Sequence, residues 1–96
     1  MFEIRMNESG EVVVSGRLDA AQAEKAQNFL DAVSGPCVVD MNGLDYISSA
    51  GLGVLLRTHK RLMGEGRGLE LVNVNSHIND IFSYSGFDKL FLISTA

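Results

Sequence analysis

The amino-acid sequence predicts a single α/β domain with a mixed sheet, and three observations support this prediction. The chain has 96 residues, which is enough for one domain with one hydrophobic core. Segments with the patterning of strands and of helices follow one another in the order β-β-α-β-α-β-α-β. Only a short polar turn separates the first two strands, so we expect an N-terminal antiparallel hairpin. Right-handed crossovers between the later strands would place the successive helices on one face of the sheet.

The first third of the chain contains the hairpin and the first helix. Apolar residues alternate with Glu3 and Arg5 over residues 2–6, the period of a half-buried strand, and residues 11–16 (EVVVSG) form the second strand. Asp19 is the expected N-cap of the helix that follows, with Gln22 three residues later as in a capping box. One face of this helix is apolar and comprises Ala23, Ala26, Phe29, Leu30 and Val33.

Residues 37–41 form a short apolar segment between the helix-ending pair Gly35-Pro36 and the turn signal Asn42-Gly43. Such a segment is typical of a central strand that is covered on both faces. We therefore expect Val38 and Val39 to be among the most buried residues. A polar turn should follow this strand and lead into the second helix.

The remaining elements are two helices and two strands. We expect the second helix over residues 49–63 and the next strand over residues 69–74. Asn75 or Ser76 should cap a third helix that ends at Gly86, and residues 90–93 should form a last strand or an apolar plug. The inner face of the second helix is expected to comprise Leu52, Leu55, Leu56, His59, Leu62 and Met63.

The stretch over residues 44–56 (LDYISSAGLGVLL) carries the main candidate functional site. Ser48 and Ser49 end a polar turn directly before the second helix, where a serine hydroxyl can accept a hydrogen bond from a free backbone N–H. The unpaired N–H groups and the positive end of the helix dipole favour a phosphate at this position. Gly51 and Gly53 weaken the first turn of a helix, and two explanations are open. Either a partner approaches the backbone closely, or the helix packs tightly on its sheet.

Composition and charge argue against several classes of function. The net charge is −4 and the pI is about 4.9, whereas binding to nucleic acid needs a basic face. No segment has the ~20 apolar residues of a membrane span, and residues 1–11 lack the apolar run of a signal peptide, so we expect no direct membrane insertion. The lone cysteine, Cys37, is expected to be a buried, reduced residue in the cytoplasm.

The sequence does not predict an enzyme. A nucleophilic Ser49 would need a base, but His59 follows ten residues later on the same helix, roughly 15 Å along its axis. His77 begins another helix, and nothing in the sequence places it beside Ser49. The histidines and the cysteine lack the spacing of a metal site, and no phosphate-binding loop occurs, so no cofactor is expected.

The serine stretch resembles the signature of the STAS domain, which sulfate transporters and bacterial anti-sigma factor antagonists share. The family pattern is approximately Asp-Ser-Ser/Gly-Gly-Leu-Gly, after a strand and at the start of a helix. Ser49 falls on the phosphorylated serine of that pattern. The positions that follow match the small residue and the Gly-Leu-Gly of the family: Ala50, Gly51, Leu52 and Gly53.

Two further points concern this resemblance. Ser48 stands where the family has its aspartate, which is a departure from the pattern. Residues 16–20 (GRLDA) are similar to the family's Gly-x-Leu-Asp turn before the first helix, so the resemblance implies that Asp19 lies near the serine turn. The order of elements also matches the family along nearly the whole chain.

The resemblance implies a non-enzymatic switch of the anti-sigma factor antagonist type. In such a switch the unphosphorylated protein binds an anti-sigma factor that is also a serine kinase. Phosphorylation of Ser49, or alternatively of Ser48, ends that binding, and a separate phosphatase restores it. The kinase would supply the ATP. By the same resemblance, the expected partner-binding residues are Asp19, Asp45, Ser48, Ala50, Gly51, Leu52 and Gly53.

A second interpretation stays open. The chain could be a STAS subunit that is never phosphorylated and only holds a larger assembly together, such as a membrane lipid-transport complex. A Ser49→Ala protein that performs fully in cells would favour this scaffold over the switch.

Overall fold

The elements follow one another in the predicted order. The computed structural model describes residues 1–95. The strands and helices are β1 (Phe2–Met6), β2 (Val12–Leu18), α1 (Ala23–Asp31), β3 (Cys37–Ile47), α2 (Ser49–Gly64), β4 (Leu69–Val74), α3 (Ser76–Ser85) and β5 (Leu92–Thr95). Two short 3₁₀ helices, η1 (Ala20–Gln22) and η2 (Phe87–Lys89), precede α1 and follow α3. β1 and β4 have the predicted bounds.

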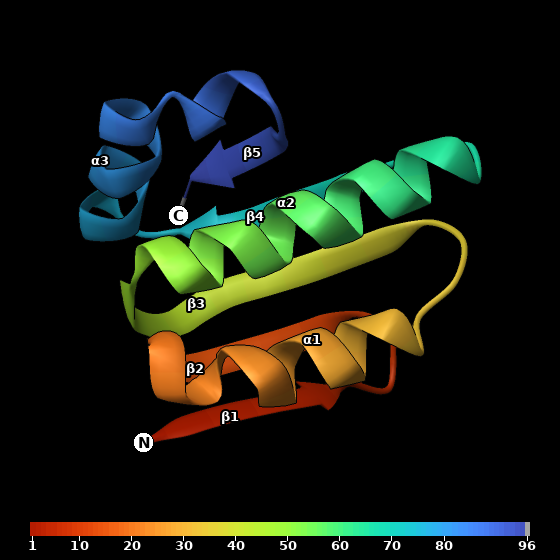
Figure 1. Cartoon of the computed structure of the whole chain (residues 1–96), viewed down its shortest axis with the longest axis horizontal. Coiled ribbons are helices and arrows are strands. Elements are labelled where there is room, and N and C mark those ends of the chain that lie inside the picture. Colours follow the sequence, from red (N-terminus) through yellow and green to blue (C-terminus); the bar gives the residue numbers. More distant parts are fainter. Residues whose placement is uncertain (96) are drawn as a thin grey trace.

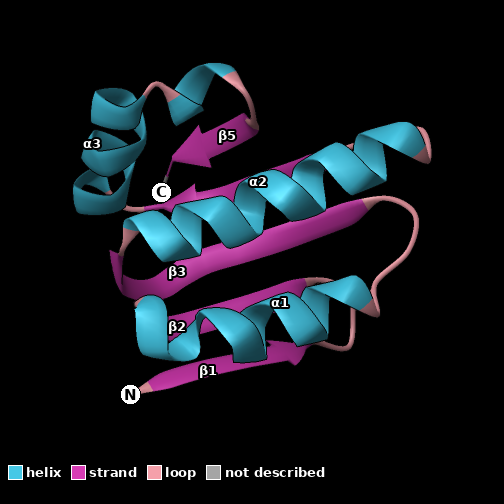
Figure 2. Cartoon of the chain, viewed as in Figure 1, coloured by secondary structure: helices cyan, strands magenta, loops and turns pink. Residues whose placement is uncertain are grey.

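The five strands form one mixed sheet in the order β1-β2-β3-β4-β5. β1 and β2 pair antiparallel, and each later strand pairs parallel with the one before it. Figure 1 shows α1 and α2 lying across the same face of the sheet, α1 over β1 and β2 and α2 over β3 and β4, with α3 beside β4. Figure 2 shows the same layering by type of element. The predicted α/β fold with its N-terminal hairpin is therefore confirmed.

One face of the sheet carries no helices, and this changes the predicted burial of the two valines of β3. Side chains alternate between the two faces of a strand, so neighbours in β3 face opposite sides. Val39 faces the helices, is 0% exposed and pairs with Val12 and Leu71. Val38 faces the side without helices and is only half-buried. Our expectation that both valines are among the most buried residues is thus right for Val39 and wrong for Val38.

β3 is longer than the sequence indicated, because it continues through the expected turn at Asn42-Gly43 and through residues 44–47. The pairing between β2 and β3 has two register shifts, one between Val13 and Ser15 and one between Gly16 and Arg17. At each shift β3 advances one residue further than β2, as a β-bulge allows. The polar pair Asn42-Gly43, predicted to form a turn, therefore lies within the strand. β3 ends at Ile47, and one residue, Ser48, separates it from α2.

Asp19 does not cap a helix with its side chain, which corrects the predicted capping box. It has extended backbone angles at the start of η1, and its carboxylate makes no capping hydrogen bond. The backbone N–H of Gln22 instead donates to the carbonyl oxygen of Asp19 over 3.1 Å, so the backbone closes this turn. Because η1 intervenes, α1 begins at Ala23.

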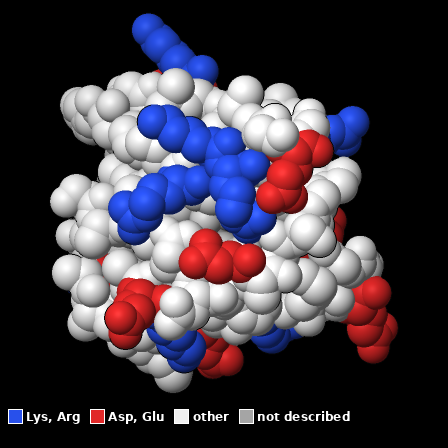
Figure 3. All heavy atoms as spheres, turned by 45° about the vertical axis from the view of Figure 1, so that its right-hand side comes forward, with Lys and Arg blue, Asp and Glu red and all other residues white. Residues whose placement is uncertain are grey.

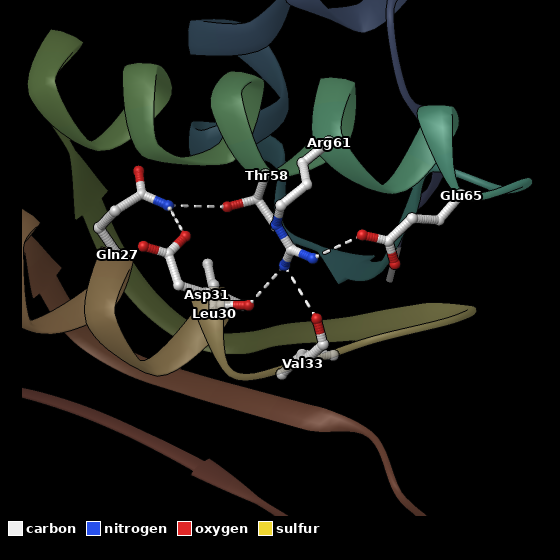
Figure 4. A network of polar contacts seen from close by, with 7 residues as sticks. All are labelled: Gln27, Leu30, Asp31, Val33, Thr58, Arg61 and Glu65. Atoms are coloured by element: carbon white, nitrogen blue, oxygen red, sulfur yellow. Dashed lines mark hydrogen bonds and ion pairs between the residues drawn. The ribbon is translucent and has the colours of Figure 1, made fainter.

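A network of polar side chains attaches α1 to α2, as Figure 4 shows. One terminal nitrogen of Arg61, Nη2, donates to the carbonyl oxygens of Leu30 (2.8 Å) and Val33 (2.9 Å) at the C-terminal end of α1. Carbonyl groups at that end of a helix have no donors from a further helical turn, so Arg61 serves as a cap supplied by the neighbouring helix. Its Nη1 pairs with Glu65 at 3.2 Å. The two helices are thereby held together as one layer.

The C-terminal part agrees with its predicted caps. The side chain of Asn75 accepts from the backbone N–H of Ile78 (2.9 Å), and Gly86 ends α3 in the left-handed conformation with φ +79°. Phe91 is buried, and β5 begins one residue later than this apolar side chain, at Leu92. No helix within residues 1–95 combines the length and the hydropathy needed to cross a bilayer.

Candidate functional site

The carboxyl ends of β2 and β3 bring the two predicted site segments together. Leu18 at the end of β2 pairs with Ile47 at the end of β3. The residue after Ile47, Ser48, donates its backbone N–H to the carbonyl oxygen of Leu18 over 2.9 Å. Asp19 directly follows Leu18. The expectation that Asp19 lies near the serine turn, which rested on the family resemblance, therefore agrees with the structure.

Ser48 is the N-cap of α2. Its backbone is extended (φ −91°, ψ 174°), and its side-chain oxygen accepts from the backbone N–H of Gly51 over 3.3 Å. Its carbonyl oxygen accepts from the N–H of Leu52 over 2.9 Å. Because Ser48 is engaged in this way, its hydroxyl oxygen is part of the cap that starts the helix.

Ser49 is the first residue of α2, and it is exposed. The predicted placement of this serine, in the first turn and reachable by solvent, is confirmed. The backbone N–H groups of Ser49 and Ala50 have no hydrogen-bond acceptor within residues 1–95, as expected for the first turn of a helix. An exposed hydroxyl therefore lies beside unpaired donors and the positive end of the α2 dipole.

Gly51 faces the sheet, which supports tight packing of α2 on the sheet as the explanation for this glycine. A β-carbon at this position would lie 2.8 Å from the side chains of Ile47 and Leu18 and equally close to the carbonyl oxygen of Leu18. Real β-carbons almost never approach other atoms so closely, so only glycine allows α2 to begin this near the sheet. Leu52 is also buried, at 7% exposed. Gly51 and Leu52 thus support the site from inside and do not present side-chain surface to a partner.

Gly53 lies on the other side of the turn and is half-buried. A β-carbon there would meet only the guanidinium group of Arg57, with Nη1 at 3.2 Å and Cζ at 3.9 Å. Arg57 therefore folds back over Gly53 in the direction of Ser49. Our sequence analysis did not select Arg57, although the spacing of 49, 53 and 57 by four residues places these positions along one side of a helix.

Charges of both signs lie near the site. The guanidinium group of Arg17 stacks on the ring of Tyr46, 4.4 Å from its centroid, at the same end of β2 and β3 as the carboxylates. Asp45 is exposed at the end of β3, and Asp19 is half-buried, with its Oδ1 buried and without a hydrogen-bond partner among residues 1–95. α2 also carries Lys60 and Arg61 beyond Arg57. Figure 3 shows Lys and Arg side chains gathered in one patch on the side of the molecule where α2 ends, with acidic side chains around it.

Neither histidine is assembled with Ser49 into a catalytic group. His59 is 8% exposed and faces inward, where its Nδ1 accepts from the backbone N–H of Leu69 (3.0 Å) and its ring contacts that of Phe91 edge-on, with centroids 4.8 Å apart. This agrees with the interpretation of His59 as a packed helix residue. His77 is exposed in the first turn of α3, and no hydrogen bond joins it to Ser49 within the described chain.

A hollow in the surface lies away from Ser49. A half-open cavity of about 440 Å³ is lined by residues from the C-terminal half of α2, β4 and the approach to β5: His59, Met63, Arg67, Gly68, Leu69, Glu70, Leu90 and Leu92. None of these residues belongs to the first two turns of α2. This cavity therefore does not include the start of α2.

Cys37 is buried at the start of β3, and burial raises the pKa of its thiol, an effect that the nearby positive charge of Arg61 opposes. A raised pKa leaves the thiol protonated near neutral pH, and a protonated, buried thiol is a poor nucleophile. Cys37 therefore belongs to the core and not to a reactive site.

The described residues combine a mixed sheet, covered by helices on one face, with an exposed serine as the first residue of α2. A sequence profile described as "Mlab, STAS domain" matches residues 3–94. The chain therefore belongs to the STAS family.

Relatives and solved structures agree with this membership. A candidate anti-sigma factor antagonist, BtrV of Bordetella bronchiseptica, is 35% identical over 85 residues, which cover 88% of this chain and 72% of the relative. An anti-sigma factor antagonist from Mycobacterium paratuberculosis superimposes with a TM-score of 0.82 at 22% identity, covering 100% of this chain and 86% of that one.

The anti-sigma factor antagonist SpoIIAA has been solved in two forms that resemble this chain. The unphosphorylated form gives a TM-score of 0.74 at 21% identity and covers 99% of this chain and 89% of its own. The phosphorylated form, from Bacillus, gives 0.68 at 21% identity, with 99% and 92% covered. These two structures show the same fold. The profile match and the 35% identity to BtrV make the chain an anti-sigma factor antagonist-like STAS protein, from a family of regulatory binding proteins.

Proposed function

We propose that this protein is a cytoplasmic regulatory switch that binds an anti-sigma factor with serine kinase activity and is released when Ser49 is phosphorylated. A cognate phosphatase would restore the binding form. The observation that carries the proposal is the placement of Ser49 as an exposed first residue of α2 beside two unpaired backbone N–H groups. The resemblance to SpoIIAA, which exists in an unphosphorylated and a phosphorylated form, supports it.

The partner-binding surface in this proposal is narrower than the predicted set. It comprises the exposed and half-buried residues around the start of α2, namely Asp19, Asp45, Ser48, Ser49, Ala50 and Gly53. Gly51 and Leu52 contribute by fixing the helix against Leu18 and Ile47. Rigid elements hold this surface, so a kinase could bind it without reorganising the domain.

The switch would act through charge at the interface. A phosphate adds nearly two negative charges, and the nearby N–H groups and helix dipole favour them by roughly 0.3–1 kcal/mol. The carboxylates of Asp19 and Asp45 oppose them, so the free energy of unfolding should change little. A partner packed on this surface would bury the phosphate without a counter-charge of its own. That costs about 2–5 kcal/mol, or roughly tens to thousands of fold in affinity.

The test compares two helix-start serines. Ser49→Asp should weaken binding to the cognate anti-sigma factor by at least tenfold in calorimetric titrations, while Ser49→Ala should bind and not be released on addition of ATP. Ser76→Asp is the matched control, because Ser76 is likewise an exposed first residue of a helix, α3. Equal weakening by both aspartates would contradict a specific role for Ser49. Full performance of Ser49→Ala in cells would instead favour the scaffold subunit of a larger assembly.

A further inference from the structure

The side chain of Arg57 extends along α2 toward Ser49, so its charge lies closer to Ser49 than its backbone does. Ser49 and Arg57 are about 12 Å apart along the helix axis, and Gly53 is halfway between them. The guanidinium group lies over Gly53, with Nη1 3.2 Å from the point where a β-carbon of that residue would be. Its side chain therefore covers about half of the distance to Ser49.

Most hydrogen-bond donors of the Arg57 guanidinium group are unused. Its Nε donates to Oε1 of Gln27 on α1 over 3.0 Å. Its two terminal nitrogens make no hydrogen bond within residues 1–95. A guanidinium carries five N–H donors in a planar fork that matches the oxygens of a phosphate, so most of this capacity is unused.

Gln27 connects Arg57 to the polar network between the helices. Its amide nitrogen donates to Oγ1 of Thr58 (3.2 Å) and to Oδ1 of Asp31 (2.9 Å), two of the contacts drawn in Figure 4. The side-chain oxygen of Gln27 is the acceptor for Arg57. Any movement of Arg57 toward the start of α2 would release that oxygen.

We propose that Arg57 is the intramolecular counter-charge for a phosphate on Ser49, and that it reaches the phosphate through the gap left by the missing side chain of Gly53. On phosphorylation the guanidinium shifts by part of a helical turn toward Ser49 and gives up its bond to Gln27. The modification is thereby communicated to α1 as well as to the surface around Ser49. This inference rests on the proposed function, because it concerns the phosphorylated form of the same serine.

The other charged groups around the start of α2 come from β2, β3 and the later turns of α2, and among them Arg17 of β2 is stacked on the ring of Tyr46. Asp19 and Asp45 lie at the ends of β2 and β3 beside the start of α2 and repel a phosphate. Arg57 is the nearest basic residue of α2 to Ser49, since Lys60 and Arg61 follow by one further turn. Lys60 is about 16 Å from Ser49 along the axis, beyond the reach of its side chain.

The experiment incorporates phosphoserine at position 49 during translation, so that no kinase is needed. The titration of the phosphate is followed by ³¹P NMR in the otherwise unchanged protein, in Arg57→Gln and in Lys60→Gln, which removes the same charge further along α2. We expect the phosphate to titrate at a pH about 0.5 lower with Arg57 present than in Arg57→Gln, because a nearby positive charge favours the dianion. Lys60→Gln should behave like the parent protein.

A second readout follows the side-chain amide of Gln27 by ¹⁵N NMR. Its resonances should move on phosphorylation when Arg57 is present and stay in place in Arg57→Gln. Gly53→Val, which fills the path between the two residues, should give the phosphate titration of Arg57→Gln although the arginine is retained. Circular dichroism melts verify that each variant is folded.

Identical phosphate titrations in Arg57→Gln and in the parent protein would overturn the inference. A shift of the phosphate titration in Lys60→Gln equal to that in Arg57→Gln would also overturn it, because it would show only the summed electrostatic field of α2. Neither result bears on whether a kinase modifies Ser49 in cells, because the phosphate is supplied during translation. Conversely, an absence of phosphorylation in cells would contradict the proposed function and leave the measured pairing of Arg57 with the phosphate intact.

Discussion

The backbone N–H of Ser48 donates to the carbonyl oxygen of Leu18 across 2.9 Å, and this bond joins the end of β2 to the start of α2. Leu18 is 1% exposed, and a β-carbon at Gly51 would lie 2.8 Å from both its side chain and its carbonyl oxygen. The helix start that carries Ser49 is therefore held by core residues on two strands. We expect the backbone at this helix start to keep its position when the charge at Ser49 changes.

The two glycines of α2 should respond in opposite ways to replacement by alanine. Gly51→Ala places a β-carbon against Leu18 and Ile47, and such overpacking costs about 1–3 kcal/mol, which exceeds the gain of up to about 1 kcal/mol in helix propensity. Gly53→Ala meets only the movable end of Arg57 and should stabilise the fold by about 0.5–1 kcal/mol. Urea melts measure both values. A destabilisation by Gly53→Ala equal to that of Gly51→Ala would show that the helix start is packed differently.

The two valines of β3 provide a matched pair for the core. Val39→Ala removes two methyl groups from a fully buried site and should lower the free energy of unfolding by about 1–3 kcal/mol. Val38→Ala is the control on the uncovered face and should cost under about 1 kcal/mol, because the side chain is only half-buried. Equal losses in chemical denaturation would mean that something covers the second face of the sheet in solution.

Cys37 should make stability depend on pH in the alkaline range. Burial holds the pKa of the folded thiol above its ordinary value of 9.0, so as the pH rises past that value the unfolded chain loses the proton first. The contribution of the thiol is fully present below pH 9.0 and is lost as the pH rises toward the pKa of the folded state. The measurement is the difference in unfolding free energy between the parent and Cys37→Ala, at about pH 7 and about pH 10. This difference should shift against the parent at the higher pH, and a constant difference would contradict a buried thiol.

Local signals predicted those parts of the fold whose residues act within one element. The alternation over residues 2–6 and the cap and end of α3 at Asn75 and Gly86 depend on neighbours in sequence, and the structure confirms them. Long-range effects explain the differences. β3 runs through Asn42-Gly43 because it accommodates extra residues as bulges against β2. A 3₁₀ helix intervenes between Asp19 and α1, which the local pattern did not indicate.

The sequence predicted some features of the candidate site and missed others. The serine at a helix start and its exposure follow from the capping pattern around Ser48 and Ser49. The inward direction of Gly51 was one of two alternatives, because periodicity alone does not say how closely a helix approaches its sheet. Arg57 was missed, since its direction over Gly53 depends on the acceptor that Gln27 offers from another helix.

Phosphorylation of Ser49 in cells can be measured from the intact mass of the protein purified from its native cells. We expect a population heavier by about 80 Da, the mass of one added phosphoryl group, that is absent in Ser49→Ala and present in Ser48→Ala. The second variant separates the two serines, because Ser48 should remain a cap and not a modified residue. An unmodified mass under every growth condition, or an added mass that persists in Ser49→Ala, would show that Ser49 is not the modified residue.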